Sequence, residues 1–249
     1  MEPARTMIDR ADGLSRLLSL AAHELRSPLS VVQGYLKMLL GPRGGTLTDD
    51  QRHLVEQASR SCARLLDLTA ELSELARLDA GTATFNMGDV ALEAVVAAVC
   101  ASHDGTARGV VVERSGADLS GLAVRADPER LRRTLEALLA AVVREAPDGE
   151  RVLVEAQIRD EGDEQSARPT AFIQMVEARI GATMLAGGPA AREAFDESRG
   201  GFGLRLPLAR RVVEAFGGRL WSPADEAHAS GLMVMLPLTT WPPAPQGRS

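Results

Sequence analysis

The chain has 249 residues, 45% of them hydrophobic, and a formal net charge of −6, which suffices for one large domain or two smaller ones, each with its own core. The acidic balance and the 3% aromatic content argue against nucleic-acid binding, because phosphate contacts need clustered Lys and Arg and single strands need stacking rings. The longest apolar runs, such as residues 137–143, are too short to span a membrane, and charged residues near the start spoil any signal peptide, so we expect a cytoplasmic protein with no membrane span.

A long amphipathic helix is predicted from about residue 7 to residue 40. Its apolar residues alternate steps of four and three, which is the seam of a helix packed in a bundle: Leu18, Ala22, Leu25, Leu29, Val32, Leu36 and Leu39. The sequence GPRGG at 41–45 ends this helix.

A second helix is predicted to begin after Thr48, because Gln51 three residues later completes the pattern of a capping box. Its expected seam again alternates fours and threes: Leu54, Ala58, Ser61, Leu65, Leu68, Leu72 and Leu75. The sequence DAGTAT at 79–84 ends it. Two antiparallel helices share only one interface, so we expect the hairpin to pair with a second copy in a dimeric four-helix bundle.

Helices and strands alternate after residue 84. Helical patterns cover about 91–102, 127–146 and 206–216, and strand patterns cover 109–115, 121–126, 151–160, 170–179 and 231–238. We therefore expect an α+β two-layer sandwich, with the helices on one face of the sheet. Residues 181–203 lack a clear period and are expected to form a mobile loop with at most one short helix. The predicted domains are 1–82, 83–240 and a disordered tail at 241–249.

His23 lies one residue after the inward-facing Ala22, so its side chain is predicted to point away from the bundle axis, with Ser27 on the same flank four residues later. Histidine titrates near neutrality, so an uncharged imidazole nitrogen is available at pH 7. The adjacent Glu24 can accept a ring proton and make the other nitrogen more nucleophilic. Pro28 removes a helical hydrogen bond and is predicted to kink the helix there. On these grounds alone, an ordinary exposed histidine beside a glutamate remains an alternative.

The sequence HELRSPLSVVQGYLKML, beginning at His23, resembles the phosphoacceptor motif of sensor histidine kinases. The resemblance implies that His23 accepts a phosphoryl group, that Glu24 is the base, and that Ser27 assists phosphatase chemistry where Thr is more usual. VRADPERLRRTLEALL and GGFGLRLPLARRVVEAFGGRLW further resemble parts of that family's ATP-binding domain. The likeness extends over residues 8–238, and it implies a GHKL (Bergerat-like) ATPase fold for the second domain.

The second domain departs from the family's magnesium motif. The resemblance implies an Asn that holds the magnesium ion on the helix over residues 131–146, but Ala141 stands at that place and offers no oxygen donor. Glu136 and Glu145 do not occupy the matching position. Cys62 and Cys100 lack the spacing of a metal site, so we expect no bound metal and two free thiols.

The nucleotide motifs also depart from the family pattern. By resemblance, Glu177 and Gly181 keep the carboxylate and the second glycine of the adenine-binding turn, whereas Arg179 replaces its first glycine. In the glycine-rich motif that follows the ATP lid, three residues remain: Gly201, Gly203 and Leu204. Arg205 stands where a further glycine is expected, and an ordinary loop before a helix is an equal alternative for these glycines.

The resemblance implies a phosphotransfer role in two-component signalling. His23 would take a phosphoryl group from the aspartate of one response-regulator receiver domain and pass it to another, with no cofactor. The first alternative is an ATP-dependent histidine autokinase, which would need ATP and magnesium. The second is a non-catalytic pseudokinase scaffold that binds another histidine kinase or a regulator. We expect the partners to be a second copy of the chain and receiver domains, and not nucleic acid.

Overall fold

The computed structural model describes residues 2–42, 44–103, 108–161, 168–178, 192–195, 197, 203–223 and 231–240. The chain divides into two compact units, Met1–Ala83 and Thr84–Ser249. Among the described residues, no helix is both long enough and apolar enough to cross a bilayer.

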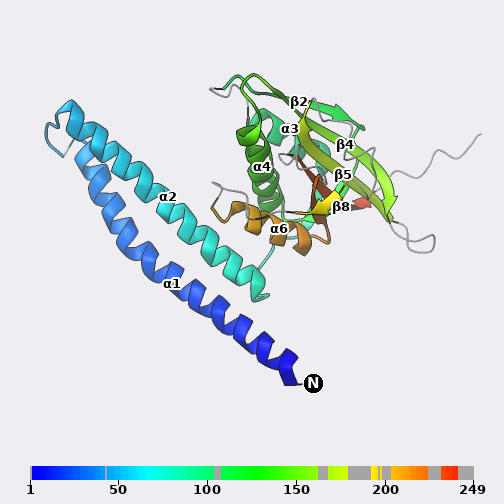
Figure 1. Ribbon diagram of the computed structural model, residues 1–249, viewed down its shortest axis with the longest axis horizontal. Helices are drawn as coiled ribbons and strands as arrows, with labels where there is room; N and C mark the ends of the chain where they lie inside the picture. The colour runs from blue at the N-terminus through cyan, green and yellow to red at the C-terminus, as the bar shows by residue number, and fades with distance from the viewer. Residues whose placement is uncertain are drawn as a thin grey trace, which may run out of the picture. The chain divides into compact units, whose positions relative to one another are not determined.

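The first unit is the predicted helical hairpin. Helix α1 (Glu2–Leu40) runs without interruption through Pro28, and α2 (Asp49–Asp79) returns alongside it (Figure 1). The capping box at the start of α2 is confirmed, because the Thr48 hydroxyl accepts from the backbone N–H of Gln51 and the Gln51 side chain accepts from the backbone N–H of Thr48. Both bonds satisfy donors that the first turn of a helix leaves open.

The stripe of α2 that faces α1 lies one residue away from the predicted bundle seam. The buried residues of α2 are spaced by seven, and half-buried residues complete the same stripe: Val55, Ser59, Cys62, Leu66, Thr69, Ser73 and Ala76. Two bonds show that this stripe faces α1, since the Cys62 thiol donates to the Leu29 carbonyl (3.3 Å) and the Gln33 side chain to the Ser59 hydroxyl (3.4 Å). The predicted stripe lies beside it, and its members Leu54 and Leu65 are exposed.

The second unit contains helices and strands in alternation, in the order β1 (Gly88–Ala91), α3 (Leu92–Ala101), β2 (Val111–Gly116), β3 (Ala123–Ala126), α4 (Pro128–Glu145), β4 (Arg151–Glu161), β5 (Arg168–Glu177), β6 (Arg192–Ala194), α6 (Arg205–Ala215), β7 (Arg219–Pro223) and β8 (Leu232–Thr240). Every predicted helix and strand of this unit is present in the predicted order, with boundaries shifted by a few residues, and three further strands accompany them.

The strands form one mixed sheet in the order β1-β3-β8-β5-β4-β2, with β7 joined to β8 and β6 to β7. The only parallel pair among the described strands is β2 with β4. Helices α3, α4 and α6 lie together on one side of the sheet (Figure 1). The predicted fold, a helical hairpin followed by an α+β sandwich, is therefore confirmed.

Three strands were not predicted. β1 and β7 are short, and β6 lies within the segment that we expected to contain only a loop with at most one short helix. Each of these strands gains its backbone hydrogen bonds from a partner strand elsewhere in the chain, β6 from β7 and β1 from β3. A period cannot be detected in so few residues, so only pairing identifies them as strands.

Helix α4 is held at both ends. At its start, the Asp127 carboxylate accepts from the backbone N–H of Arg130 (3.2 Å), and Pro128 occupies the first turn. At its end, the Arg108 guanidinium donates to the carbonyls of Arg144 (2.6 Å) and Ala146 (2.7 Å). These hydrogen bonds satisfy both ends of the helix on which the resemblance places the magnesium ligand.

Candidate functional site

His23 and Glu24 stand side by side on the outer surface of α1. The preceding residue, Ala22, is fully buried against α2, so the next two side chains are directed outward. The side chain of His23 is 78% exposed and that of Glu24 is 73% exposed, with Nδ1 of the imidazole 3.6 Å from Oε1 of the carboxylate. The pair is open to any macromolecule that approaches this flank of the hairpin.

The geometry distinguishes the two ring nitrogens of His23. Nδ1 faces the Glu24 carboxylate, at a distance slightly longer than a hydrogen bond, so a small rotation of either side chain closes the contact. A carboxylate that accepts a hydrogen bond from Nδ1–H stabilises the tautomer in which the proton is on Nδ1 and Nε2 carries the lone pair. Nε2 is then the nitrogen available for nucleophilic attack.

The turn after His23 is short of one helical hydrogen bond. Pro28 has no N–H, so it cannot donate to the carbonyl of Glu24 four residues earlier. Ser27 is exposed on the same turn, and the Ser30 hydroxyl donates to the Arg26 carbonyl at 2.8 Å. The helix continues through this segment, with one backbone acceptor beside the site left without its usual donor.

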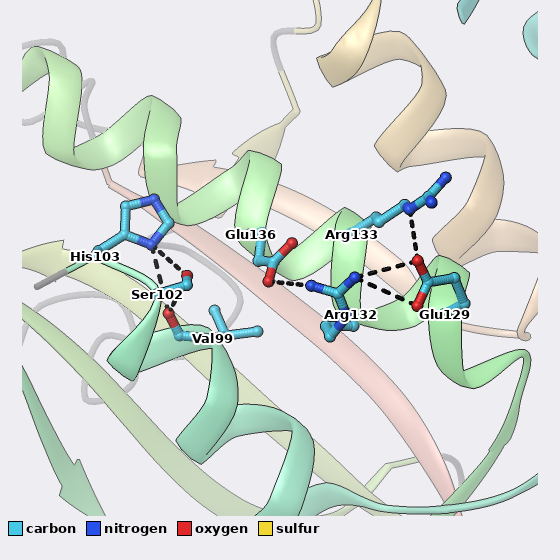
Figure 2. Close-up of polar contacts among 7 residues, drawn as sticks. All are labelled: Val99, Ser102, His103, Glu129, Arg132, Arg133 and Glu136. Carbon is cyan, nitrogen blue, oxygen red and sulfur yellow. Dashed lines mark hydrogen bonds and ion pairs between the residues drawn. The ribbon is translucent and has the colours of Figure 1, made fainter.

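His103 provides a contrast with His23. It follows the end of α3, where its Nδ1 lies 2.9 Å from the Ser102 hydroxyl and 3.4 Å from the Val99 carbonyl (Figure 2). The Nδ1 atom of His103 thus lies beside a hydroxyl and a carbonyl at the helix end, and not beside a carboxylate. His53 lies exposed on α2 and has no carboxylate partner among the described residues. Of the three histidines that the structure describes, His23 alone has a carboxylate beside a ring nitrogen.

In the second unit, the predicted magnesium position does not offer a ligand. Ala141 lies on α4 with its side chain fully buried, and a methyl group cannot coordinate a hard cation. Glu136, one of the possible substitutes, is engaged by Arg132, whose Nη1 lies 2.6 Å from the carboxylate (Figure 2). Glu145 is exposed at the end of the helix.

Glu136 belongs to a row of ion pairs on the exposed side of α4. Arg132 also contacts Glu129 (3.1 Å), and Nε of Arg133 lies 2.8 Å from the same Glu129 carboxylate (Figure 2). The hydrogen bond from Arg132 holds the pKa of Glu129 below its usual value. These spacings of three and four residues are those of ordinary helix-stabilising pairs, so the row is explained without a ligand.

The predicted nucleotide residues are only partly described. Glu177 ends β5 opposite Val152 and is 3% exposed, so its carboxylate is held inside the unit. Gly203 has φ +61° and Leu204 immediately precedes α6, whose first residue, Arg205, is exposed. Three further predicted positions lie outside the described residues: Arg179, Gly181 and Gly201. Among the residues that the structure describes, no cluster of His, Cys, Asp and Glu has the form of a metal site.

The sequence analysis missed a group of residues at the start of the second unit. Phe85 packs edge-on against Phe216, and the guanidinium of Arg130 lies 4.6 Å from the centre of the Phe85 ring. The backbone N–H of Asn86 donates to Asp127 at 2.9 Å. No local signal could identify this group, because its members come from segments far apart in the sequence.

Comparison with known proteins bears directly on the helical hairpin. Residues 14–81 match the family model of the His Kinase A (phospho-acceptor) domain. The chain is 28% identical over 233 residues to the circadian input-output histidine kinase CikA of Synechococcus elongatus, covering 90% of this chain and 30% of that protein. It is 27% identical over 236 residues to the sensor protein DivL of Caulobacter vibrioides, covering 90% of this chain and 28% of that protein.

The cell-division control histidine kinase PdhS of Brucella anthropi is 23% identical over 95% of this chain and 23% of its own length. The chain therefore spans less than a third of these curated relatives.

Solved structures agree at the level of the fold. Full-length ShkA, in complex with AMPPNP, superposes with a TM-score of 0.67 at 24% identity, covering 91% of this chain and 46% of that one. The Acinetobacter baumannii histidine kinase AdeS gives a TM-score of 0.52 at 16% identity, covering 88% and 98%. With the hairpin match, these findings confirm the resemblance: residues 14–81 match the His Kinase A (phospho-acceptor) domain, and the chain is similar over most of its length to part of several histidine kinases.

Proposed function

We propose that this protein is a phosphotransfer protein of two-component signalling. His23 accepts a phosphoryl group from the aspartyl phosphate of one receiver domain and passes it to the aspartate of another. The observation that carries the proposal is the exposed His23 imidazole with Glu24 beside its Nδ1 atom. An exposed nucleophile on the side of a rigid helix suits a donor held on another protein.

The transfer needs only groups that this chain and its partner supply. The Nε2 lone pair attacks phosphorus, the bond between phosphorus and the aspartyl oxygen breaks, and the aspartate leaves as a carboxylate. A phosphorylated imidazole that keeps its Nδ1 proton is positively charged, and the neighbouring Glu24 carboxylate stabilises that charge through a hydrogen bond. Transfer to a second receiver is the same step in reverse.

The second unit supports transfer without ATP. Phosphoryl transfer from a nucleotide depends on a metal ion that neutralises the phosphates. The buried methyl of Ala141 offers no oxygen at the expected position, and Glu136 is paired with Arg132. The residues present therefore do not fit a magnesium ion, and no step of the proposed reaction uses one bound by this chain.

The hairpin also supports a homodimer. Within one chain, α1 and α2 leave large apolar side chains exposed along both helices: Leu14, Leu17, Leu25, Val32, Tyr35, Leu39, Leu54 and Leu65. On helical wheels with 100° per residue, these positions gather on one flank of the hairpin, whereas His23 and Ser30 lie on the opposite flank. Three further exposed residues, Leu20, Val31 and Met38, lie on the side of α1 that is turned away from α2. A second hairpin that covers the apolar flank completes a four-helix bundle and leaves His23 open.

An autokinase is the second candidate, and one observation favours it. Glu177 keeps a buried carboxylate at the end of β5, where the family resemblance places an adenine-binding acid. The related ShkA was solved with the ATP analogue AMPPNP. Incubation with radiolabelled ATP and magnesium separates the candidates, because acid-labile label on the wild type and not on His23→Gln would establish autokinase activity and overturn the claim that the ATP site is impaired.

The phosphotransfer proposal is tested with a panel of purified receiver domains charged with radiolabelled acetyl phosphate. Acid-labile label is expected on the wild type, and none on His23→Gln. Absence of label from every receiver in the panel would contradict the proposal and leave the scaffold role. Equal label on the His23→Gln variant would place the acceptor elsewhere.

A further inference from the structure

The shortest strand among those described, β6, lies at an edge of the sheet. Its three residues, Arg192–Ala194, pair with the end of β7, and β7 is the one strand with which β6 pairs in the part of the chain that the structure describes. A ladder of three residues makes few hydrogen bonds against the entropy of fixing its backbone, so it is marginal by itself. Contacts outside the ladder must therefore help to keep β6 in the sheet.

The residues that follow β6 supply such contacts. Phe195 is 6% exposed, so its ring is buried within the unit. Two residues further along, Oε2 of Glu197 lies 3.6 Å from Nη1 of Arg210 and 3.5 Å from Nη1 of Arg211. Both arginines belong to α6, so a single carboxylate joins the chain after β6 to two consecutive residues of this helix.

The Glu197 carboxylate is held by charge and not by hydrogen bonds. Its Oε2 atom is buried and accepts no hydrogen bond from the described residues. A buried carboxylate oxygen without donors destabilises a fold unless nearby positive charge compensates for the lost hydration, and the two guanidinium groups provide that charge. The three side chains are between 32% and 41% exposed, so their attraction is open to screening by salt.

Loss of these ion pairs would affect both β6 and β7. Without them, only the buried Phe195 ring and the three-residue ladder hold β6 in place. When β6 separates, the backbone groups of β7 that faced it lose their partners, and an unpaired strand edge is able to pair with a strand of another chain. Strand β7 itself stays in the sheet, because β8 pairs with its other edge.

We propose that Glu197 is an electrostatic latch that keeps β6 paired with β7, and that salt opens it. The closed latch fixes the chain after β6 to the second turn of α6 and covers the end of β7. The open latch frees β6 while the rest of the sheet stays intact. This inference goes beyond the proposed phosphotransfer and does not depend on it, because His23 lies in the other compact unit.

Hydrogen exchange of the full chain, resolved by mass spectrometry, tests the latch. Glu197→Gln keeps the length of the side chain and removes its charge. The amides of β6, and those of β7 that face it, should therefore exchange about threefold to tenfold faster than in the wild type. The amides of β5, in the middle of the sheet, should exchange at the wild-type rate and serve as the internal reference.

Glu214→Gln is the matched control. Glu214 pairs with Arg210 at 2.9 Å within α6, one turn further along the helix, so its loss leaves the latch carboxylate in place and β6 should exchange as in the wild type. Arg210→Gln combined with Arg211→Gln should free β6 as Glu197→Gln does. Addition of Glu197→Gln to that pair should cause no further increase, because the same interaction has already been lost.

Salt distinguishes a latch from a merely structural role for Glu197. An increase in NaCl from about 0.1 M to about 1 M shortens the Debye length from about 10 Å to about 3 Å. Exchange of β6 in the wild type should then rise toward the rate of Glu197→Gln, whereas β6 in the variant should respond to salt no more than β5 does.

Three results would overturn the inference: wild-type exchange of β6 in Glu197→Gln, release of β6 to the same extent in Glu214→Gln, or an equal response of β6 to salt in the wild type and Glu197→Gln. Circular dichroism of each variant confirms that the second unit remains folded. Loss of phosphotransfer would have no bearing on any of these results.

Discussion

Nδ1 of His23 lies 3.6 Å from Oε1 of Glu24, and both side chains are open to solvent on the same turn of α1. The two residues are neighbours in sequence, so the helix itself brings them together, without help from a distant part of the fold. A small rotation of either side chain brings the carboxylate within hydrogen-bonding distance of Nδ1–H. The Nε2 lone pair then remains available for attack on phosphorus.

Replacement of this carboxylate should impair transfer while the acceptor remains in place. Glu24→Gln keeps the size of the side chain but cannot take a proton or balance the charge of a phosphorylated imidazole. A hydrogen bond to a charged group contributes about 1.5 to 3 kcal/mol, so the rate of His23 labelling by a charged receiver should fall by about 10- to 100-fold. Quench-flow labelling measures it, and an unchanged rate would show that Glu24 is a bystander.

The flank of the hairpin on which we propose that a second copy binds can be tested separately from the transfer reaction. Val32→Asp places a charge on the apolar flank of α1, whereas Ser30→Asp, two residues earlier, places the same charge on the polar flank. Sedimentation should find monomers for Val32→Asp and dimers for Ser30→Asp at the same concentration. Dimers in both variants would mean that a different surface holds the copies together.

Restoring the family's asparagine should not restore an ATP site. Ala141→Asn inserts an amide where the side chain is fully buried, and overpacking with an unsatisfied polar group should lower the free energy of unfolding by about 2 to 4 kcal/mol. Urea denaturation measures the loss. A variant as stable as the wild type that gains ATP-dependent label would show instead that space for a nucleotide site exists beside α4.

The N-cap of α4 should make stability depend on acid. Burial alone would raise the pKa of Asp127, but the N–H groups of Asn86 and Arg130 and the Arg130 charge outweigh it and hold that pKa below its usual value. A carboxyl whose pKa is lower in the folded state stabilises the fold above its unfolded pKa, near 4, and this contribution is lost as pH falls through the folded value.

Asp127→Asn removes the titrating group but keeps an oxygen that can accept from Arg130. Urea denaturation between pH 6 and pH 3 should therefore show a smaller loss of stability in the variant than in the wild type. A loss of equal size in both proteins would show that other carboxyl groups account for the acid sensitivity. Circular dichroism at each pH confirms that both proteins start from the folded state.

The sequence predicts those features that depend on near neighbours. The capping box at Thr48 and the outward direction of His23 follow from positions a few residues apart, and both agree with the structure. The stripe of α2 that faces α1 lies one residue away from the predicted seam, because small and polar residues, Cys62, Thr69 and Ala76, form that contact, while larger leucines form the stripe beside it. A pattern of leucines identifies the most apolar stripe, which is not the one that faces α1.

Features that join distant segments could not be predicted in this way. β1 contains Gly88 and Asp89, both disfavoured in strands, and it forms because β3 pairs with it. The contacts of Phe85 and Asn86 join the segment before β1 to the start of α4 and the end of α6. Neither has a period or a motif, so only the tertiary structure shows them.

The most direct test of the account is a relay in two steps. The protein is first labelled by one receiver domain charged with radiolabelled acetyl phosphate, then purified and mixed with a second, uncharged receiver. The account predicts that acid-labile label on His23 disappears and appears on the aspartate of the second receiver, with none transferred through His23→Gln. Label that never reaches His23, or that reaches the second receiver equally well through the variant, would contradict it.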